Sequence, residues 1–259
     1  MTLSTFDISG KTCLVVGGTS GLGQAVTLGL VQAGARVVAG SSNPAKVAAM
    51  KTLLGPGHDA ISVDVSNPDS AAAAVAHTVK TLGRIDALIN AAGVIKKQPS
   101  LDLSPADFEA SVRVNLVGAF IVAQAAGRVM KDQSPDARGQ RGGIITFASL
   151  NSYVSFSEVL AYACGKAGVM ALTRGLANEW AQYGIRVNGI APGVFPTDLN
   201  RPLIAGTPRG RWLMDHTPMG RFGQAEEIVG AAVYLLSDAA SFVTGETLVV
   251  DGGFLARAV

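Results

Sequence analysis

A tyrosine and a lysine one helical turn apart are the residues of this chain best suited to proton transfer. Tyr162 and Lys166 stand four residues apart in a segment of helical pattern, 158–183, so both side chains should project from one helix face. An ammonium near a phenol favours the phenolate, so we expect Lys166 to lower the pKa of Tyr162 from its reference of about 10. Such a phenol can donate and accept a proton near neutral pH. Taken alone, the spacing also fits an exposed surface pair.

A serine upstream supports the proton-transfer interpretation. Ser149 follows the apolar run 143–148, thirteen residues before Tyr162. Its hydroxyl is therefore expected at the carboxyl end of a strand, where it could bond a substrate oxygen beside the phenol.

A glycine-rich turn follows the first apolar run of the chain. Gly17, Gly21 and Gly23 lie between a predicted strand, 12–17, and a predicted helix, 22–33. Glycines let the backbone turn sharply and approach a pyrophosphate, whose charge is stabilised at the N-terminus of the following helix. The spacing is G-x-x-x-G-x-G rather than the commoner G-x-G-x-x-G, and in a chain with 31 glycines it also fits an ordinary turn. Its position directly after the first strand favours phosphate binding.

The end of the second predicted strand bears on which dinucleotide binds. An acidic side chain there accepts hydrogen bonds from the adenosine ribose, whereas a 2′-phosphate requires cations and no carboxylate. This chain has Ser41, Ser42 and Asn43, with Lys46 nearby and no arginine. The sequence therefore favours NADP(H) slightly over NAD(H).

Seven apolar runs alternate with helical patterns along the chain. The strands are predicted at 12–17, 36–39, 60–65, 85–90, 143–148, 185–191 and 247–250. The helices are predicted at 22–33, 44–54, 68–82, 104–130, 158–183 and 225–236. This alternation predicts an α/β fold, a doubly wound parallel seven-stranded sheet with helices on both faces.

No segment interrupts this alternation, so we predict one domain over residues 1–259. The polar stretch 133–142 is too short to separate two domains. The Pro- and Arg-rich excursion at 192–220 follows a strand end, where ligands of such sheets bind. An insertion at about 193–220 is therefore expected to cover the site as a lid.

The composition is apolar and almost neutral. Hydrophobic residues make up 48% of the chain, charged residues 15%, and the net charge is +2. With no basic run longer than Lys96-Lys97, the chain lacks the electrostatic pattern of a nucleic-acid-binding protein. The apolar stretch 116–126 is interrupted and too short to span a bilayer, so no membrane partner is expected. The low charge indicates a sheet covered on both faces, with further surface covered by partner subunits.

The cysteines, the histidines and the N-terminus bear on compartment and metal binding. Cys13 and Cys164 show no C-x-x-C spacing, as expected of reduced thiols in a cytoplasm. The three histidines share no ligand spacing, so no metal site is expected. The N-terminus has no basic residue before Lys11 and does not resemble a secretory signal.

Together these residues resemble the short-chain dehydrogenase/reductase family over essentially the whole chain, from Gly10 to Gly253. The positions that carry the resemblance are Gly17, Gly21, Gly23, Asp64, Asn90-Ala91-Ala92-Gly93, Asn115, Ser149, Tyr162, Lys166, Asn188 and Pro192-Gly193. The resemblance implies a Rossmann-type, NAD(P)-dependent oxidoreductase that moves a hydride between a nicotinamide and a carbonyl or alcohol carbon. It further implies a homotetramer.

The resemblance also assigns roles to individual residues. Tyr162 would be the general acid/base, Ser149 would orient the substrate oxygen, Lys166 would hold the ribose and lower the pKa of Tyr162, and Asn115 would support a proton-relay water. Asp64 would lie by the adenine, and Thr197 would meet the carboxamide. The full set of residues expected at the cofactor is Gly17, Thr19, Ser20, Gly21, Leu22, Gly23, Ser41, Ser42, Asp64, Val65, Asn90, Ala91, Gly93, Tyr162, Lys166, Pro192, Gly193 and Thr197.

Two positions depart from the family pattern. The threonine usual before the first glycine is Val16, which removes a hydroxyl that often steadies the loop. The usual N-N-A-G is Asn90-Ala91-Ala92-Gly93, so the second asparagine is lost. Neither departure touches the hydride-transfer groups, and we expect an active enzyme.

The segments around Ser149 and after Pro192 resemble the branch of gluconate 5-dehydrogenases and related sugar-acid ketoreductases. A polyhydroxy acid needs hydrogen-bond partners for its hydroxyls, for which Asn151 is a candidate. Its carboxylate needs a cation, for which Arg201, Arg209 and Lys97 are candidates, although each arginine also fits a solvated lid.

Other functions stay open at this point. The alternative substrates are a 3-oxoacyl thioester and 2-deoxy-3-ketogluconate. A more distant alternative is a catalytically inactive, nucleotide-sensing Rossmann protein, which would be expected to have lost the acid/base pair.

Overall fold

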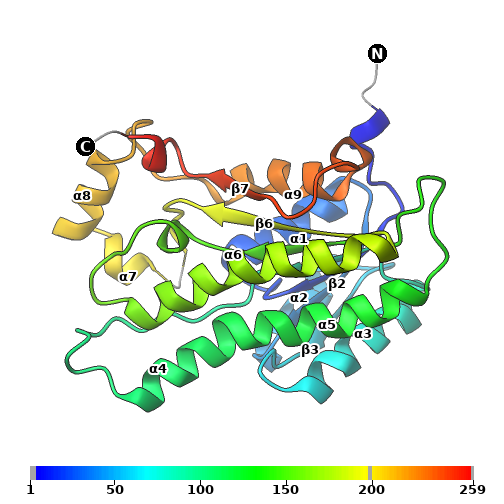
Figure 1. The fold of residues 1–259 in the computed structure, drawn as a ribbon, viewed down its shortest axis with the longest axis horizontal. Helices are drawn as coiled ribbons and strands as arrows, with labels where there is room; N and C mark the ends of the chain where they lie inside the picture. Colours follow the sequence, from blue (N-terminus) through cyan, green and yellow to red (C-terminus); the bar gives the residue numbers. More distant parts are fainter. Residues whose placement is uncertain (1–3, 198–199, 258–259) are drawn as a thin grey trace.

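A seven-stranded parallel sheet organises the structure, a computed structural model that describes residues 4–197 and 200–257 (Figure 1). The strand order is β3-β2-β1-β4-β5-β6-β7, and every neighbouring pair is parallel. The strands are β1 (Thr12–Val16), β2 (Arg36–Ser41), β3 (Asp59–Ser62), β4 (Ala87–Asn90), β5 (Gly142–Phe147), β6 (Ile185–Pro192) and β7 (Thr247–Val250). The predicted doubly wound, Rossmann-type single domain is confirmed.

Helices cover both faces of this sheet. The principal helices are α1 (Gly21–Gln32), α2 (Pro44–Leu54), α3 (Pro68–Leu82), α4 (Pro105–Val112), α5 (Gly118–Asp132), α6 (Leu160–Trp180) and α9 (Val229–Leu236). Buried side chains of α3, α5 and α6 pack on one face, and those of α1 and α9 pack on the other. Strands that are buried on both faces need few charged residues, which accounts for part of the low charge of the chain.

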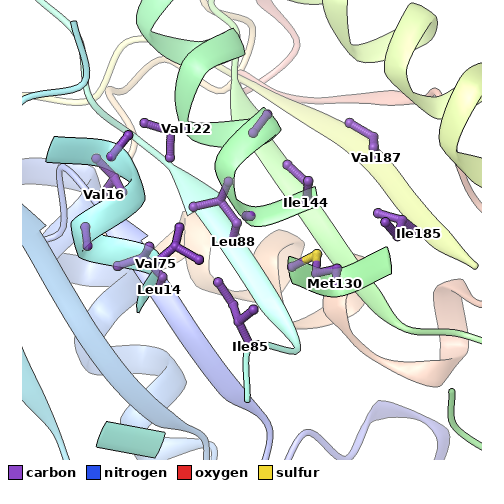
Figure 2. Close-up of a cluster of buried hydrophobic side chains, with 14 of the residues drawn as sticks. Leu14, Val16, Val75, Ile85, Leu88, Val122, Met130, Ile144, Ile185 and Val187 are labelled. Atoms are coloured by element: carbon purple, nitrogen blue, oxygen red, sulfur yellow. The ribbon is translucent and has the colours of Figure 1, made fainter. Parts of the chain in front are cut away.

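The larger core cluster lies between the sheet and helices α3, α5 and α6 (Figure 2). Leu88 of β4 and Ile144 of β5 are almost completely buried there, together with Met130 of α5. Burial of such side chains contributes about 1.5–3 kcal/mol each. This packing fixes the strands, and therefore the loops that follow them.

Three helices start at the same local signal. Asn43, Asn67 and Ser104 precede α2, α3 and α4, and each N-cap side chain accepts a hydrogen bond from a backbone N–H of the first turn. A proline follows each cap, where its fixed φ suits the first helical position and its missing N–H costs nothing. The sequence therefore sets where these helices begin after their strands.

The long helix predicted at 104–130 contains a π-helical segment that the sequence does not indicate. Arg113–Val117 forms this π turn between α4 and α5, and the helix continues through it. By length and composition alone, Pro105–Asp132 could cross a membrane, with 44% of its most apolar window buried in the protein. Its buried residues include Val122, Ala126 and Met130 of the core.

The remaining differences from the predicted elements are small. β3 ends at Ser62 rather than at residue 65, because the chain turns at Asp64, whose carboxylate accepts hydrogen bonds from Ser66. The last predicted helix begins as a 3₁₀ turn, Ala225–Ile228, before α9. The excursion at 193–220 contains two short helices, α7 (Arg201–Ile204) and α8 (Pro208–Asp215), and its residues 198 and 199 lie outside the described part of the chain.

Candidate active site

A cavity of about 640 Å³ runs along the carboxyl ends of the strands. Its walls include Gly17 after β1, Ser41 at the end of β2, Asp64 after β3, Gly93 after β4 and Ser149 after β5. Parallel strands present all these ends at one edge of the sheet, which explains why residues far apart in sequence meet there. The volume is in the range of small-molecule and cofactor sites.

The glycine-rich turn forms a cradle that larger residues would fill. Gly17 has a φ of +76°, and a Cβ there would lie 2.6 Å from the backbone nitrogen of Ala92. A Cβ at Gly23 would overlap the carbonyl oxygen of Gly17. Ser20 is the N-cap residue of α1, but its side chain accepts no hydrogen bond from the first turn of this twelve-residue helix. These features fit the pyrophosphate of a dinucleotide.

Another hydroxyl steadies this turn where Val16 replaces the usual threonine. Thr27 of α1 donates a hydrogen bond to the carbonyl oxygen of Gly18 at 3.0 Å, and the backbone nitrogens of Gly17 and Gly18 both donate to Gly40. Thr19, within the turn, is buried and is not among the residues that line the cavity. The loss of one hydroxyl at Val16 therefore leaves the turn with other hydrogen bonds.

The adenosine end of the cavity carries hydroxyls and a cation. Ser41, Ser42 and Lys46 line it beside the N-terminus of α2. The side chain of Ser41 accepts a hydrogen bond from Asn43 at 3.2 Å. Hydroxyls, an ammonium and the positive end of a helix dipole all favour a phosphate at this position.

Asp64 and Val65 line the neighbouring part of the cavity. Hydrogen bonds from the hydroxyl and then the backbone N–H of Ser66 hold the pKa of Asp64 below its usual value. Its carboxylate is therefore fixed in the turn after β3.

The side chain of Ser149 interacts with that of Tyr162 and favours its phenolate. Both line the cavity, with Lys166 one helical turn further along α6. The Lys166 ammonium lies 5.7 Å from the centre of the Tyr162 ring and donates a hydrogen bond of 2.6 Å to the carbonyl oxygen of Phe147. The three groups singled out by spacing thus meet in one cavity wall.

The electrostatics of this group differ from the expectation based on spacing. Burial raises the pKa of Tyr162, and the hydrogen bond from Ser149 opposes that shift without reversing it. Burial lowers the pKa of Lys166 to about 8, because Lys166 is only 4% exposed and its charge is poorly solvated. In this structure, therefore, Ser149 is the residue that favours the phenolate of Tyr162. Burial of the Lys166 ammonium is unfavourable.

Asn115 lies in the π segment and holds the loop after β4. Its side-chain amide donates to the carbonyl oxygens of Val94 and Ser111, both at 2.9 Å, and its oxygen accepts from the nitrogen of Val94. A Cβ at Gly165 would lie 3.0 Å from the Asn115 side chain, so α6 approaches the π segment closely. Asn115 does not itself line the cavity, and its side chain positions the loop that does.

Ser152 is a contributor that sequence reasoning missed. It forms a capping box with Ser149, and its hydroxyl donates to the backbone oxygen of Lys166 at 2.7 Å. The turn that carries Ser149 is thus tied to the helix that carries Lys166. The S-x-x-S spacing from 149 to 152 is the sequence signal that could have indicated this cap.

The other cofactor candidates form the remaining walls. Asn90 is buried and accepts a hydrogen bond from Ala92, whereas Ala91 and Gly93 line the cavity. On the opposite side, a Cβ at Gly193 would lie 2.5 Å from the Cα of Asp251, so only glycine fits there. The lining candidates on these two walls are Leu22, Ala91, Gly93, Pro192, Gly193 and Thr197.

The structure separates the four substrate candidates, of which Lys97 pairs with Glu158 and is not among the lining residues. Asn151 and Arg209 line the cavity with Phe156, and the Arg209 guanidinium lies 5.9 Å from the centre of the Phe156 ring. Arg201 is exposed in α7 and is not among the lining residues. Within residues 4–197 and 200–257, no group of three His, Cys, Asp or Glu side chains could hold a metal ion.

Comparison with known proteins shows full-length similarity to characterised dehydrogenases. A family model described as Enoyl-(Acyl carrier protein) reductase matches residues 16–255. A 2-dehydro-3-deoxy-D-gluconate 5-dehydrogenase of Escherichia coli (strain K12) is 37% identical over 99% of this chain and all of its own length. A gluconate 5-dehydrogenase of Gluconobacter oxydans (strain 621H) is 36% identical over 96% of each chain.

A solved structure extends this similarity to the fold. The gluconate 5-dehydrogenase of Burkholderia cenocepacia J2315, crystallised with NADP and tartrate, is 38% identical and has a TM-score of 0.92. The match covers all of both chains. These similarities support the use of a nicotinamide cofactor.

The buried ammonium leads to a prediction about stability. Lys166→Met should stabilise the protein by about 2 kcal/mol at pH 7, from about 3 kcal/mol of relieved burial less about 1 kcal/mol for the hydrogen bond to Phe147. The folded-state pKa of about 8 lies below that of an unfolded lysine, so the gain should be full below pH 8 and shrink as pH rises towards 10.5.

Denaturant unfolding between pH 7 and pH 10 measures this difference. Exposed Lys80 provides the control, since Lys80→Met should change the free energy of unfolding by less than about 0.5 kcal/mol at any of these pH values. A Lys166→Met protein that is less stable than the wild type at pH 7 would show that the ammonium is not destabilising.

Proposed function

The chain belongs to the short-chain dehydrogenase/reductase family, and we propose that it transfers a hydride between NADP(H) and a hydroxyl or keto carbon of a sugar acid. The observation that carries the proposal is that Ser149, Tyr162 and Lys166 line the same cavity as the glycine cradle. The sugar-acid class is supported by the names of the relatives and by Asn151 and Arg209 in that cavity.

Proton transfer is the task of Tyr162 in this proposal. When bound, the nicotinamide ring supplies or accepts the hydride at the substrate carbon. Tyr162 gives a proton to the substrate oxygen during reduction and takes one from it during oxidation. Ser149 donates a hydrogen bond to the same oxygen, which orients the carbonyl and stabilises the charge that develops on it.

Lys166 and Asn115 act beside this pair. The Lys166 ammonium holds the ribose and, once it leaves the Phe147 carbonyl, lies close enough to favour the phenolate of Tyr162. Asn115 supports a proton-relay water next to the loop that it clamps.

Of the residues expected at the cofactor, all but Thr19 and Asn90 line the cavity. The turn from Gly17 to Gly23 and the N-terminus of α1 would hold the pyrophosphate, Asp64 would lie by the adenine, and Thr197 would meet the carboxamide, and all of these residues but Gly18 and Thr19 line the cavity. Preference for NADP(H) over NAD(H) is supported by the hydroxyls at the end of β2 and by Lys46.

Residues 193–220 cover the substrate as a lid. Asn200, Ile204, Arg209 and Leu213 of this segment line the cavity, which supports the assignment. Of the two arginines, Arg209 is the better candidate for the substrate carboxylate, and Arg201 fits the solvated outer side of the lid.

We further propose a cytoplasmic homotetramer. Cys13 and Cys164 are both free thiols, as expected of a reducing compartment. Phe120 of α5 is 39% exposed, and a Cβ at Gly175 of α6 would meet open space. The surface of α5 and α6 around these two residues is the part that we propose packs against another subunit.

The proposed chemistry predicts a selective loss in Tyr162→Phe. With gluconate and 5-ketogluconate as substrates, kcat should fall by about 10²–10⁴-fold, because the ring stays and only the proton-transfer oxygen is lost. NADP(H) affinity, measured by titration, should change far less than kcat. Tyr153→Phe is the control, since Tyr153 is 43% exposed and lies outside the cavity lining.

A panel that includes 2-deoxy-3-ketogluconate and an acetoacetyl thioester, read by NADPH absorbance, identifies the substrate class. Turnover of the thioester alone would reject the sugar-acid assignment. Retained turnover in Tyr162→Phe, on any substrate of the wild type, would reject the mechanism.

The cofactor preference is tested at Ser41. Ser41→Asp should lower the ratio of kcat/KM for NADP(H) to that for NAD(H) by at least about tenfold, because a carboxylate repels the 2′-phosphate and accepts bonds from a ribose hydroxyl. Ser62→Asp adds the same charge to the residue paired with Ser41 on β3, outside the cavity lining, and should leave the ratio almost unchanged. Equal ratios in Ser41→Asp and the wild type would contradict the assignment.

A further inference from the structure

Three segments of the chain meet at the rim of the cavity around the carboxylate of Glu158. The Lys97 ammonium, from the loop after β4, lies 2.9 Å from Oε2 of Glu158. The Arg209 guanidinium, from α8 of the lid, lies 3.9 Å from the same oxygen. Two cations from different segments therefore converge on one carboxylate that belongs to the protein itself.

The backbone at Glu158 is unusual. Among the described residues, Glu158 is the one non-glycine residue with a left-handed backbone, at a φ of 68°. This conformation costs about 1–2 kcal/mol for a residue with a Cβ. Its carbonyl oxygen accepts a hydrogen bond of 2.7 Å from the nitrogen of Gln98, which pins the loop in place. A glycine would fit without strain, so a glutamate here indicates that the side chain has a role.

The two ion pairs are unequal. Lys97 makes a contact of hydrogen-bond length, whereas Arg209 sits about one ångström further away and donates instead to the carbonyl oxygen of Ser157 at 3.1 Å. Arg209 is also the member that lines the cavity, beside Asn151 and Phe156. The weaker partner of Glu158 is thus the one that can reach a bound substrate.

From this geometry we infer that Glu158 is an exchange partner for the substrate carboxylate. In the empty site Glu158 holds Arg209 at the rim. When a sugar acid enters, Arg209 turns from Glu158 to the substrate carboxylate, and Lys97 continues to neutralise Glu158. No covalent bond changes, and the site discriminates between acids and neutral polyols because only an anion replaces Glu158 on Arg209. The inference deepens the proposed function and rests on it.

The role of Lys97 gives the sharpest test. In Lys97→Met, Arg209 becomes the remaining cation beside Glu158, so it is held more tightly and D-gluconate should bind about threefold more weakly. In Lys97→Met/Glu158→Gln the competing carboxylate is gone, so gluconate affinity should return to at least the wild-type value. D-glucitol, the neutral counterpart, should bind equally well to all these proteins.

Calorimetric titration of the NADPH-loaded proteins measures these affinities without turnover, because gluconate and the reduced cofactor cannot react with each other. Lys96→Met is the matched control, because Lys96 is adjacent in sequence but pairs with Asp107 at 2.8 Å, and its affinity for gluconate should match the wild type. Because binding and turnover are measured separately, gluconate that binds in the predicted order but is not oxidised would count against the proposed reaction and not against the exchange.

Three results would overturn the inference. Equal weakening in Lys97→Met and in the double variant would mean that Lys97 itself binds the carboxylate. Equal affinity for gluconate in all variants would mean that the ion pairs of Glu158 play no part in substrate binding. A wild-type protein that binds gluconate no better than glucitol would mean that no carboxylate site exists at this rim.

Discussion

The parallel direction of all seven strands is the constraint on which the site depends. Because every strand ends at the same edge, five loops that are distant in sequence deliver Gly17, Ser41, Asp64, Gly93 and Ser149 to one cavity. The buried packing of β4 and β5 against α5 fixes the positions of those strand ends. The positions of the candidate catalytic residues therefore follow from the parallel direction of the strands and from the packing of the core.

A buried ammonium is the main energetic cost of this arrangement. Lys166 is 4% exposed, and its one strong contact in this structure is the carbonyl oxygen of Phe147. A methionine of similar length would pack there without that cost, so the lysine has a functional reason. The turn from Ser149 to Ser152 holds this helix against the strand end, because the Ser152 hydroxyl donates a hydrogen bond to the backbone oxygen of Lys166.

Local patterns in the sequence predict the fold well, because apolar periodicity is set by residues that are close together in the chain. They also bring Ser149, Tyr162 and Lys166 together correctly. The predicted lowering of the pKa of Tyr162 was wrong. Burial raises this pKa, and residue spacing does not reveal burial. The π turn around Asn115 and the left-handed backbone at Glu158 were not predicted. Both residues contact segments that are distant in sequence, and local patterns do not reveal such contacts.

Hydride transfer to a sugar-acid carbon is the central claim, and isotope transfer tests it most directly. 5-Ketogluconate is reduced with NADPH that carries deuterium at C4 of the nicotinamide, using both C4 epimers, and the product is examined by NMR. We predict gluconate with deuterium on C5, the carbon that bears the new hydroxyl, from one epimer. Absence of deuterium at C5 from both epimers, in a protein that still binds NADPH, would contradict the account.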